Sequence, residues 1–398
     1  MTELPLAGIV VVAVEQAVAV PFATRQLADL GARVIKIERP GTGDFARGYD
    51  DKVSGISSAF VWLNRGKESI ELDIKSRSGR AVLDALLGRA DIFLHNISPS
   101  AARRQGLDSA TLAALHPTLI CGSVSGYGSG GPLSDAKAYD LLIQGEAGLM
   151  SLNGDKDNFA KVGISVADIA AGMYVYSSAL AALFHRSRTN EALPIDVSLF
   201  DSLAEWLSYP MYYTKHGGTA PERMGTSHAT IAPYGGFETA DGQRILLAVQ
   251  NDREWRRFCD AVMERAEFAI DPRFGSHAAR VDNRLALDDE IARTLREIDY
   301  ASLVKRLDAA DIAYARMNTI DQLATHEQLD SRGRWTPTGS EVGDIDTLLP
   351  PWFPENHVPR FGSIPSLGEH TEQVLDWIAD DLELPPPTTA TQERAMKP

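Results

Sequence analysis

The sequence predicts an α/β fold with a parallel sheet covered by helices. The stretch Gly8–Val20 begins with an uncharged, β-branched run, typical of a strand buried on both faces. Pro21 then opens a helical pattern that continues to Leu30, and Gly31 suits the position just after a helix. A second short strand is expected over Val34–Glu38. Together these segments form a β-α-β unit of about thirty residues, the building block of parallel sheets.

The same alternation continues along the first half of the chain. We expect a strand at Leu72–Ile74, a helix over Gly79–Ala90, and strands at Asp91–Leu94 and Leu119–Val124. This order of elements indicates a Rossmann-like layer structure. We therefore assign residues 1–205 to a large Rossmann-like domain.

The order of elements changes after residue 205. Breaker residues at 214–221 indicate a linker, which we place at 206–225. A hairpin over 237–249, with Asp-Gly at its turn, and the helical segments that follow it predict a small α+β domain at 226–330. Residues 331–398 contain a Pro- and Gly-rich return linker around 336–360 and a C-terminal helix over 367–382.

Composition and charge exclude several classes of protein. The 398 residues include 39 Lys and Arg against 54 Asp and Glu, a net charge of −15 that opposes binding to nucleic acid. The two cysteines, Cys121 and Cys259, form neither a disulfide framework nor a zinc-site spacing. The first residues lack the basic region of a signal peptide, and the apolar stretch at 170–183 is short for a membrane span. We expect a cytoplasmic protein without a membrane partner.

Asp168 is the most unusual charged residue of the chain. Apart from this aspartate, the stretch from Ile164 to Leu183 carries no charged side chain. A carboxylate in apolar surroundings is costly unless it has partners or a chemical role. It suits the N-cap or first turn of a helix, where Asp is favoured, and it suits a nucleophile. Position alone leaves both interpretations open.

Other residues that could carry chemistry are basic side chains and glycine loops. The basic residues near predicted strand ends, where open α/β sheets bind ligands, are Lys36, Arg39, Arg47, Lys67, Lys75, Arg103, Arg104 and Lys137. Each of them is also compatible with a solvated surface position. The first β-α turn lacks the Gly-x-Gly-x-x-Gly pattern, which disfavours ordinary NAD binding. The loop at Gly235-Gly236 is either a tight turn or a source of N–H groups for an oxyanion.

Ordered motifs along nearly the whole chain resemble the class III CoA-transferases, a family that includes formyl-CoA:oxalate transferase, carnitine CoA-transferase and α-methylacyl-CoA racemase. The matching segments are Leu30–Pro40, Gly43-Asp44, Arg47-Gly48, Asn64–Asp73, Asn96 with Arg104 and Gly106, Ser125–Gly128, Tyr139-Asp140, Gly163–Asp168, Asp271–Phe274 and Pro365–Thr371. The resemblance implies a large domain built from both chain ends, a small domain between them, and two chains interlocked as a homodimer.

The resemblance also implies roles for individual residues. Asp168 matches the catalytic aspartate, which forms a covalent aspartyl intermediate. The positions that match the CoA site are Ala19, Arg39, Leu72, Lys75, Asn96, Ile97, Arg104, Lys137 and Tyr139. CoA thioesters are then substrates, and no metal or permanently bound cofactor is expected. The N–H groups of Gly235 and Gly236 are candidates to stabilise oxyanions.

Departures from the family pattern narrow the expected reaction. Tyr139 stands where the racemases have a proton-shuttling His, which favours transfer over racemisation. Val18 stands where the formyl-CoA:oxalate enzyme has a Gln, which argues against oxalate as the acceptor acid. Segments 15–26 and 223–235 resemble transferases that use succinyl-CoA and the C4–C5 acids itaconate, mesaconate, citramalate or malate. The first alternative is an intramolecular mesaconyl-CoA C1–C4 transferase, and the less favoured one is an α-methylacyl-CoA racemase. Candidates for the distal carboxylate of the acid are Arg47, Arg223 and His228.

Overall fold

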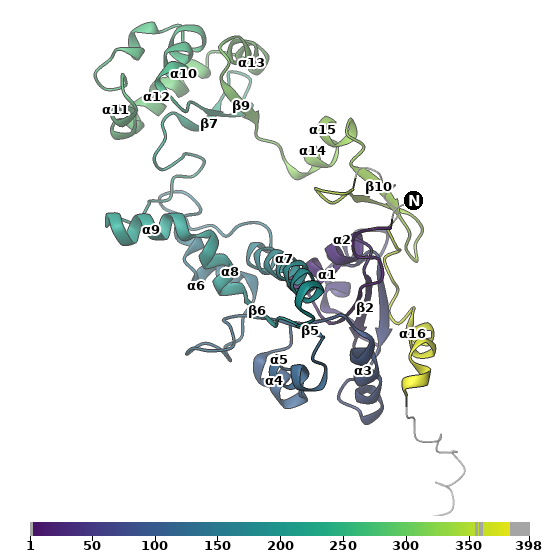
Figure 1. The fold of residues 1–398 in the computed structure, drawn as a ribbon. Coiled ribbons are helices and arrows are strands. Elements are labelled where there is room, and N and C mark those ends of the chain that lie inside the picture. Colours follow the sequence, from purple (N-terminus) through teal and green to yellow (C-terminus); the bar gives the residue numbers. More distant parts are fainter. Residues whose placement is uncertain (1–2, 355–356, 358–360, 383–398) are drawn as a thin grey trace, which may run out of the picture. The chain divides into compact units, whose positions relative to one another are not determined.

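The computed structural model describes residues 3–354, 357 and 361–382, and they divide into two compact units (Figure 1). Unit 1 contains 1–147, 163–208 and 331–398, and unit 2 contains 148–162 and 209–330. Both ends of the chain thus belong to unit 1. Residues 148–162, which the sequence analysis assigned to the large domain, belong instead to unit 2. The last part of the predicted C-terminal segment, 383–398, lies outside the described residues.

Unit 1 is built on a six-stranded parallel sheet, which confirms the predicted α/β class. The strand order is β3-β2-β1-β4-β5-β6. The strands are β1 Val10–Val14, β2 Arg33–Glu38, β3 Lys67–Glu71, β4 Ile92–His95, β5 Ile120–Ser125 and β6 Ile195–Ser198. The chain runs outward from β1 to β3 and then returns to β4, so the direction of winding reverses between β1 and β4. In sheets of this kind, ligands bind at the carboxyl ends of the strands beside such a reversal.

Helices cover both the central strands and the edges of this sheet. They are α1 Ala19–Asp29, α2 Ser58–Asn64, α3 Arg77–Arg89, α4 Pro99–Gln105, α5 Ser109–Leu115, α6 Asp140–Glu146, α7 Val166–Thr189, α8 Leu199–Trp206 and α16 Thr371–Trp377. Val374 of α16 is buried in one cluster with Leu83 of α3 and Phe93 of β4. This cluster fastens the C-terminal part of the chain to the N-terminal sheet. The predicted C-terminal helix over 367–382 is therefore present, but shorter.

The third strand was placed too late in the sequence. The prediction was Leu72–Ile74, whereas β3 spans Lys67–Glu71. The pattern Lys-Glu-Ser-Ile-Glu does not read as a buried strand, because it carries three charges. The structure resolves this conflict, since Lys67 is only 2% exposed and forms an ion pair with Glu15 at 2.7 Å.

Helix α7 is the long apolar element of unit 1. Its residues Ala170, Ala171, Val175 and Ala179 are buried, and it packs against α1 and α8. By length and composition alone it is long enough to cross a membrane, contrary to the expectation from the shorter stretch 170–183. Of its most apolar window, 44% is buried within the described chain. A core helix of a folded domain shows the same combination, so α7 is weak support for a membrane span.

Unit 2 combines an antiparallel sheet with helices. The strands are β7 Tyr234–Glu238, β8 Arg244–Ala248 and β9 Ala313–Arg316, in the order β7-β8-β9. The helices are α9 Ser208–Gly217, α10 Asp252–Arg257, α11 His277–Asp282, α12 Arg284–Leu295, α13 Tyr300–Ala309, α14 Ile320–Ala324 and α15 Glu327–Asp330. Trp255, Phe258 and Leu287 lie in its buried core. Residues 208–217, which we had placed in a linker, form α9.

The predicted return linker belongs to unit 1 and contains a hairpin of β10 Trp335–Thr338 and β11 Ile345–Leu348.

Candidate active site

Asp168 lies in the first turn of α7 and is half-buried. The N-cap residue, Ser165, makes no capping hydrogen bond with its side chain. The backbone N–H of Ala167 donates instead to Asp140 Oδ1 at 2.8 Å. Asp140, from the first turn of α6, therefore does the work of a cap for α7. Asp168 is therefore not the N-cap of α7, although it occupies the first turn, which is one of the two positions that the sequence had left open.

The carboxylate of Asp168 meets the beginning of a second helix, α1. The backbone N–H of Ala19, the first residue of α1, donates a hydrogen bond to Asp168. The N-cap residue Val18 has no side chain that can satisfy this end of α1. Gly172, one turn after Asp168, allows the close approach: a Cβ there would lie 2.6 Å from the Ala19 carbonyl oxygen. The absence of a side chain at Gly172 thus brings the two helices together at Asp168.

The surroundings of Asp168 raise its pKa to about 7. The largest cause is burial, which disfavours the ionised form, and the nearby negative charge of Asp140 adds to it. The hydrogen bond from Ala19 acts in the opposite direction but is outweighed. At neutral pH the carboxyl group is thus close to its own pKa. Strongly shifted carboxyl groups of this kind are common at catalytic sites.

Two tyrosines share this region with Asp168. The pKa of Tyr49 is raised by burial and by the charges of Asp44, Asp168 and Tyr139. Tyr49 is 55% exposed and Tyr139 is 70% exposed, so both rings are accessible. Tyr49 was not predicted from the sequence, because it follows the short turn Phe45–Gly48 and carries no motif of its own.

The residues that match the family's CoA site all lie in unit 1, and several of them follow strands. Arg39 comes directly after β2, Leu72 after β3, and Asn96 and Ile97 after β4. Carboxyl ends of parallel strands share one edge of a sheet, so these residues and Ala19 lie along the edge where ligands bind. Lys75, Arg104, Lys137 and Tyr139 are exposed. The arrangement is compatible with CoA binding, and the individual contacts stay predictions.

Two other basic residues near strand ends, Lys36 and Lys67, have structural roles. Lys36 is fully buried and bonds Asp44 at 2.7 Å and Glu15 at 3.3 Å. Lys67 is buried against the same Glu15. Burial opposes the ionised form of Glu15, but the two ammonium groups outweigh it and lower the pKa of that carboxyl. These lysines therefore neutralise buried carboxylates and are not available to a ligand.

Arg47 is also occupied. Its Nε and Nη2 donate to the two carboxylate oxygens of Glu38 at 2.9 and 2.7 Å. Its guanidinium lies 3.8 Å from the centre of the Phe60 ring. Burial raises the pKa of Glu38, but the pairing with Arg47 and the charge of Lys36 outweigh it and lower the pKa to about 2. The structure therefore gives no support to Arg47 as the group that binds a substrate carboxylate.

The remaining substrate candidates lie in unit 2. Arg223 donates to the carbonyl oxygens of Asp155 and Lys156 at 2.8 and 2.7 Å, and His228 stacks on Tyr234. Gly235 and Gly236 are paired with Leu247 and Leu246 in the β7-β8 ladder.

The N–H of Gly236 donates to Thr226 Oγ1 at 3.1 Å and is already used. A Cβ at Gly235 would lie 2.9 Å from Ser227 Oγ. Close packing of the 226–227 loop explains these glycines, so we no longer regard Gly236 as an oxyanion donor.

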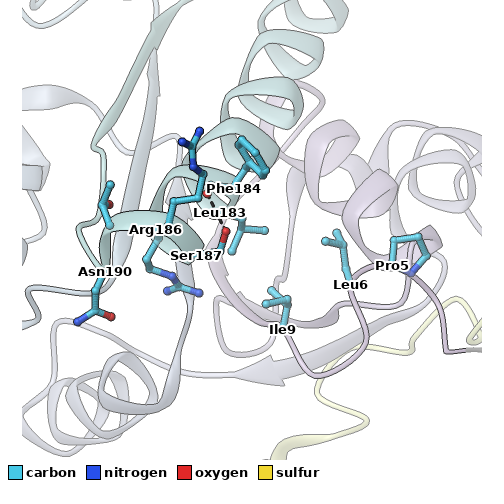
Figure 2. Close-up of a pocket in the computed structure, with 10 residues that line it drawn as sticks. Pro5, Leu6, Ile9, Leu183, Phe184, Arg186, Ser187 and Asn190 are labelled. Carbon is cyan, nitrogen blue, oxygen red and sulfur yellow. Dashed lines mark hydrogen bonds between the residues drawn. The ribbon is translucent and has the colours of Figure 1, made fainter.

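A cavity of about 680 Å³ lies at the other end of α7 (Figure 2). It is lined by Pro5, Leu6, Ile9 and residues 183, 184 and 186–190. Fifteen residues separate Asp168 from Leu183, which in an α-helix corresponds to about 22 Å. This cavity is therefore separate from the Asp168 site. Within the described residues, no group of three or more His, Cys, Asp or Glu side chains is placed to hold a metal ion.

Comparisons with known proteins agree on one family. The model of "CoA-transferase family III" matches residues 6–371. A succinate–glutarate CoA-transferase of Agrobacterium fabrum is 33% identical over 93% of this chain and 95% of its own length. A succinyl-CoA:mesaconate CoA-transferase of Haloarcula hispanica is 32% identical over 91% of this chain and 93% of its own. The crystal structure of a CAIB/BAIF family protein from Brucella suis superposes with a TM-score of 0.83 at 30% identity, covering 95% of this chain and all of that one.

Proposed function

The chain belongs to CoA-transferase family III and is an enzyme of that class, and we propose that it moves CoA from succinyl-CoA to a C4–C5 dicarboxylic acid through a covalent intermediate on Asp168. The observation that supports this proposal most strongly is the raised pKa of Asp168. Among the described residues, the influences on its pKa are burial, Asp140 and the Ala19 amide, and these do not include a cation. A structural ion pair would lower the pKa of such a carboxyl group, whereas a raised pKa is the kind of shift common at catalytic sites.

The reaction is a series of exchanges at acyl carbons. The Asp168 carboxylate attacks the thioester carbon of the donor, the C–S bond breaks, and CoA thiolate leaves an acyl-aspartyl anhydride. The thiolate then attacks the Asp168 carboxyl carbon and expels the donor acid as its carboxylate. This gives an aspartyl-CoA thioester. The acceptor carboxylate attacks the same carbon, releases the thiolate and forms a new anhydride. Attack of the thiolate on the acceptor's acyl carbon restores the Asp168 carboxylate.

The N–H of Ala19 is the group that stabilises the negative charge formed during these reaction steps. When the Asp168 carboxyl carbon is attacked, negative charge develops on its oxygen, at the position that the Ala19 N–H already faces. The amide is fixed in the first turn of α1, whose N-terminal end favours negative charge. We therefore assign to Ala19 the role that the sequence analysis had given to Gly235 and Gly236.

The acceptor acid is proposed from the relatives. Their names include glutarate and mesaconate as acids and succinate or succinyl-CoA as the other partner. Both acids fall in the C4–C5 range expected from segments 15–26 and 223–235. We propose an acceptor of this range, with glutarate added to itaconate, mesaconate, citramalate and malate. Transfer within one mesaconyl-CoA molecule is the second candidate, because it would use the same aspartyl chemistry.

We also propose that the enzyme is a cytoplasmic homodimer with interlocked chains. Helix α9 supports an assembly of this kind, since none of its residues is buried in the described chain. Its side chains Tyr209 and Tyr212 are 65% and 56% exposed. Aromatic side chains of this kind are enriched in protein interfaces.

A screen of acids tests the proposal. Purified enzyme is incubated with succinyl-CoA and, one at a time, glutarate, itaconate, mesaconate, citramalate, malate and oxalate, and the CoA esters are separated by chromatography. We expect a new CoA ester with at least one C4–C5 acid and none with Asp168→Asn. Asp108→Asn, the same change at the N-cap of α5, is the matched control and keeps activity.

Two results would argue against the proposal. One is the absence of exchange with every acid of the panel. The other is full activity of Asp168→Asn. Exchange of the α-hydrogen of a branched acyl-CoA in D₂O, without any acceptor acid, would favour a racemase instead.

A further inference from the structure

We propose that Asp44 and Asn96 are positioning residues that clamp the β1–α1 turn in a strained conformation and thereby aim the Ala19 N–H at Asp168. The inference rests on the proposed role of Asp168 as the nucleophile. It assigns a positioning role to Asp44, and it adds the holding of this turn to the CoA contact expected for Asn96.

The strain lies at Ala17, in the middle of the turn between β1 and α1. Ala17 has a φ of +61°, in the left-handed region that residues with a Cβ rarely adopt. For a residue other than Gly, this conformation costs about 1–2 kcal/mol relative to a right-handed one. Such a conformation persists only where the surrounding contacts impose it.

Contacts on both sides of the turn impose this conformation. The N–H of Ala17 donates to Asp44 Oδ1 at 2.8 Å. The preceding residue, Gln16, is held from both of its backbone polar groups by Asn96. Its N–H donates to Asn96 Oδ1 at 3.2 Å, and Asn96 Nδ2 donates to its carbonyl oxygen at 2.7 Å. The two side chains therefore fix three backbone groups of two consecutive residues.

The clamp is anchored in the interior of unit 1. Asp44 is 3% exposed, and its second oxygen, Oδ2, accepts from Lys36 Nζ at 2.7 Å. Lys36 is fully buried and also reaches Glu15, the residue just before the turn. Asn96 directly follows β4, the strand beside β1. Both side chains are therefore attached to the sheet, so the turn cannot drift away from it.

The β1–α1 turn leads directly to Ala19, which belongs to the proposed active site. Only Val18 separates Ala17 from Ala19, whose N–H meets Asp168. A rotation at Ala17 therefore moves the Ala19 amide directly. Misplacing a catalytic group by about 1 Å can cost about 100-fold in rate. The side-chain amide of Asn96 uses both its oxygen and its nitrogen to hold Gln16, so the clamp gives Asn96 a role that does not depend on a contact with CoA.

The test separates positioning from CoA binding. With succinyl-CoA and the best acid of the screen, we expect Asn96→Ala to lower kcat about 10- to 100-fold and to leave the KM for succinyl-CoA within about threefold. Adding Ala17→Gly should recover about fivefold in kcat, because glycine adopts the left-handed conformation without a Cβ penalty. Asn283→Ala is the matched control: its amide also donates to backbone carbonyls, but in unit 2.

Two kinetic outcomes overturn the clamp. The first is a KM that rises tenfold or more in Asn96→Ala while kcat is retained, the behaviour of a CoA contact. The second is a lower kcat that Ala17→Gly does not restore. If Asn96→Ala does not fold, Asn96→Asp replaces it, because it keeps the acceptor for the Gln16 N–H and puts a charged acceptor in place of the donor to the Gln16 carbonyl oxygen. For this variant too we expect a lower kcat.

A second measurement is independent of the proposed function. Backbone amide hydrogen exchange of residues 16–20 should be faster in Asn96→Ala than in the wild type and in Asn283→Ala. Unchanged exchange would overturn the clamp even in an active enzyme. Lack of transferase activity in the wild type, together with faster exchange in the variant, would refute the proposed function and retain the clamp.

Discussion

Replacing Asp168 by Asn should stabilise the protein at neutral and alkaline pH. In the folded chain the pKa of Asp168 is about 7, against 3.8 for an ordinary aspartate. Between these two values the folded state binds a proton that the unfolded state has lost, so folding stability falls as pH rises through this range. Above pH 7 the cost of the ionised carboxylate is complete. Asn has the same shape, accepts the same Ala19 hydrogen bond, and carries no charge.

The structure sets the size of the effect. The difference between 3.8 and about 7 corresponds to about 4 kcal/mol, at 1.36 kcal/mol for each pH unit. The side chain is half-buried, and water screens part of this penalty. We therefore expect Asp168→Asn to raise the free energy of unfolding by about 2–4 kcal/mol at pH 8 and by little at pH 4. Under the proposed mechanism, this cost is the stability that the enzyme gives up to keep the nucleophile in place.

Urea unfolding followed by tryptophan fluorescence, at a series of pH values and one protein concentration, measures the difference. Five of the six tryptophans belong to unit 1, and only Trp255 belongs to unit 2. Asp108→Asn is the control with the opposite sign, because hydrogen bonds with Thr111 outweigh burial and lower the pKa of Asp108. The reasoning is refuted if Asp168→Asn is no more stable than the wild type at pH 8, or if its gain is as large at pH 4.

Three further predictions concern neighbours of the site and the core. Asp140→Asn keeps an acceptor for the Ala167 N–H but removes a negative charge, so the pH inflection of kcat/KM should move below that of the wild type; an unmoved inflection contradicts this. Gly172→Ala should lose about 1–3 kcal/mol in urea unfolding and slow CoA transfer, because its Cβ would press on the Ala19 carbonyl. Burial lowers the pKa of His95 to about 4, so unfolding stability should fall by about 3 kcal/mol from pH 6.5 to pH 4, and His95→Leu should flatten that decline.

The elements that the sequence predicts well are those whose pattern is local. The strand at residues 10–14, the helix after it and the strand at 33–38 follow from a β-branched run, a proline and a glycine. The strand at 67–71 was misplaced because its charges are satisfied by residues far away in the sequence: Lys67 pairs with Glu15, 52 positions away, and Glu68 pairs with Arg33. No local pattern contains that information.

The site shows the same division. Asp168 stands out in the sequence because it is a single charge at the start of an apolar stretch. The group that contacts Asp168 does not stand out, because it is the backbone amide of Ala19 and no side chain marks it. Gly172, which allows the close approach of α1, is equally inconspicuous in the sequence. Arg47 resembled a substrate ligand because an arginine near a strand end has no visible partner in the sequence, whereas the fold gives it Glu38.

The most direct test of the account is to identify the covalent intermediate. The enzyme is mixed with succinyl-CoA, treated with hydroxylamine or borohydride, digested and analysed by mass spectrometry. Covalent catalysis by Asp168 predicts modification of the peptide that contains this residue, at its side chain, and none in Asp168→Asn. An active enzyme that yields no adduct at Asp168, or yields one at another carboxylate, would contradict it.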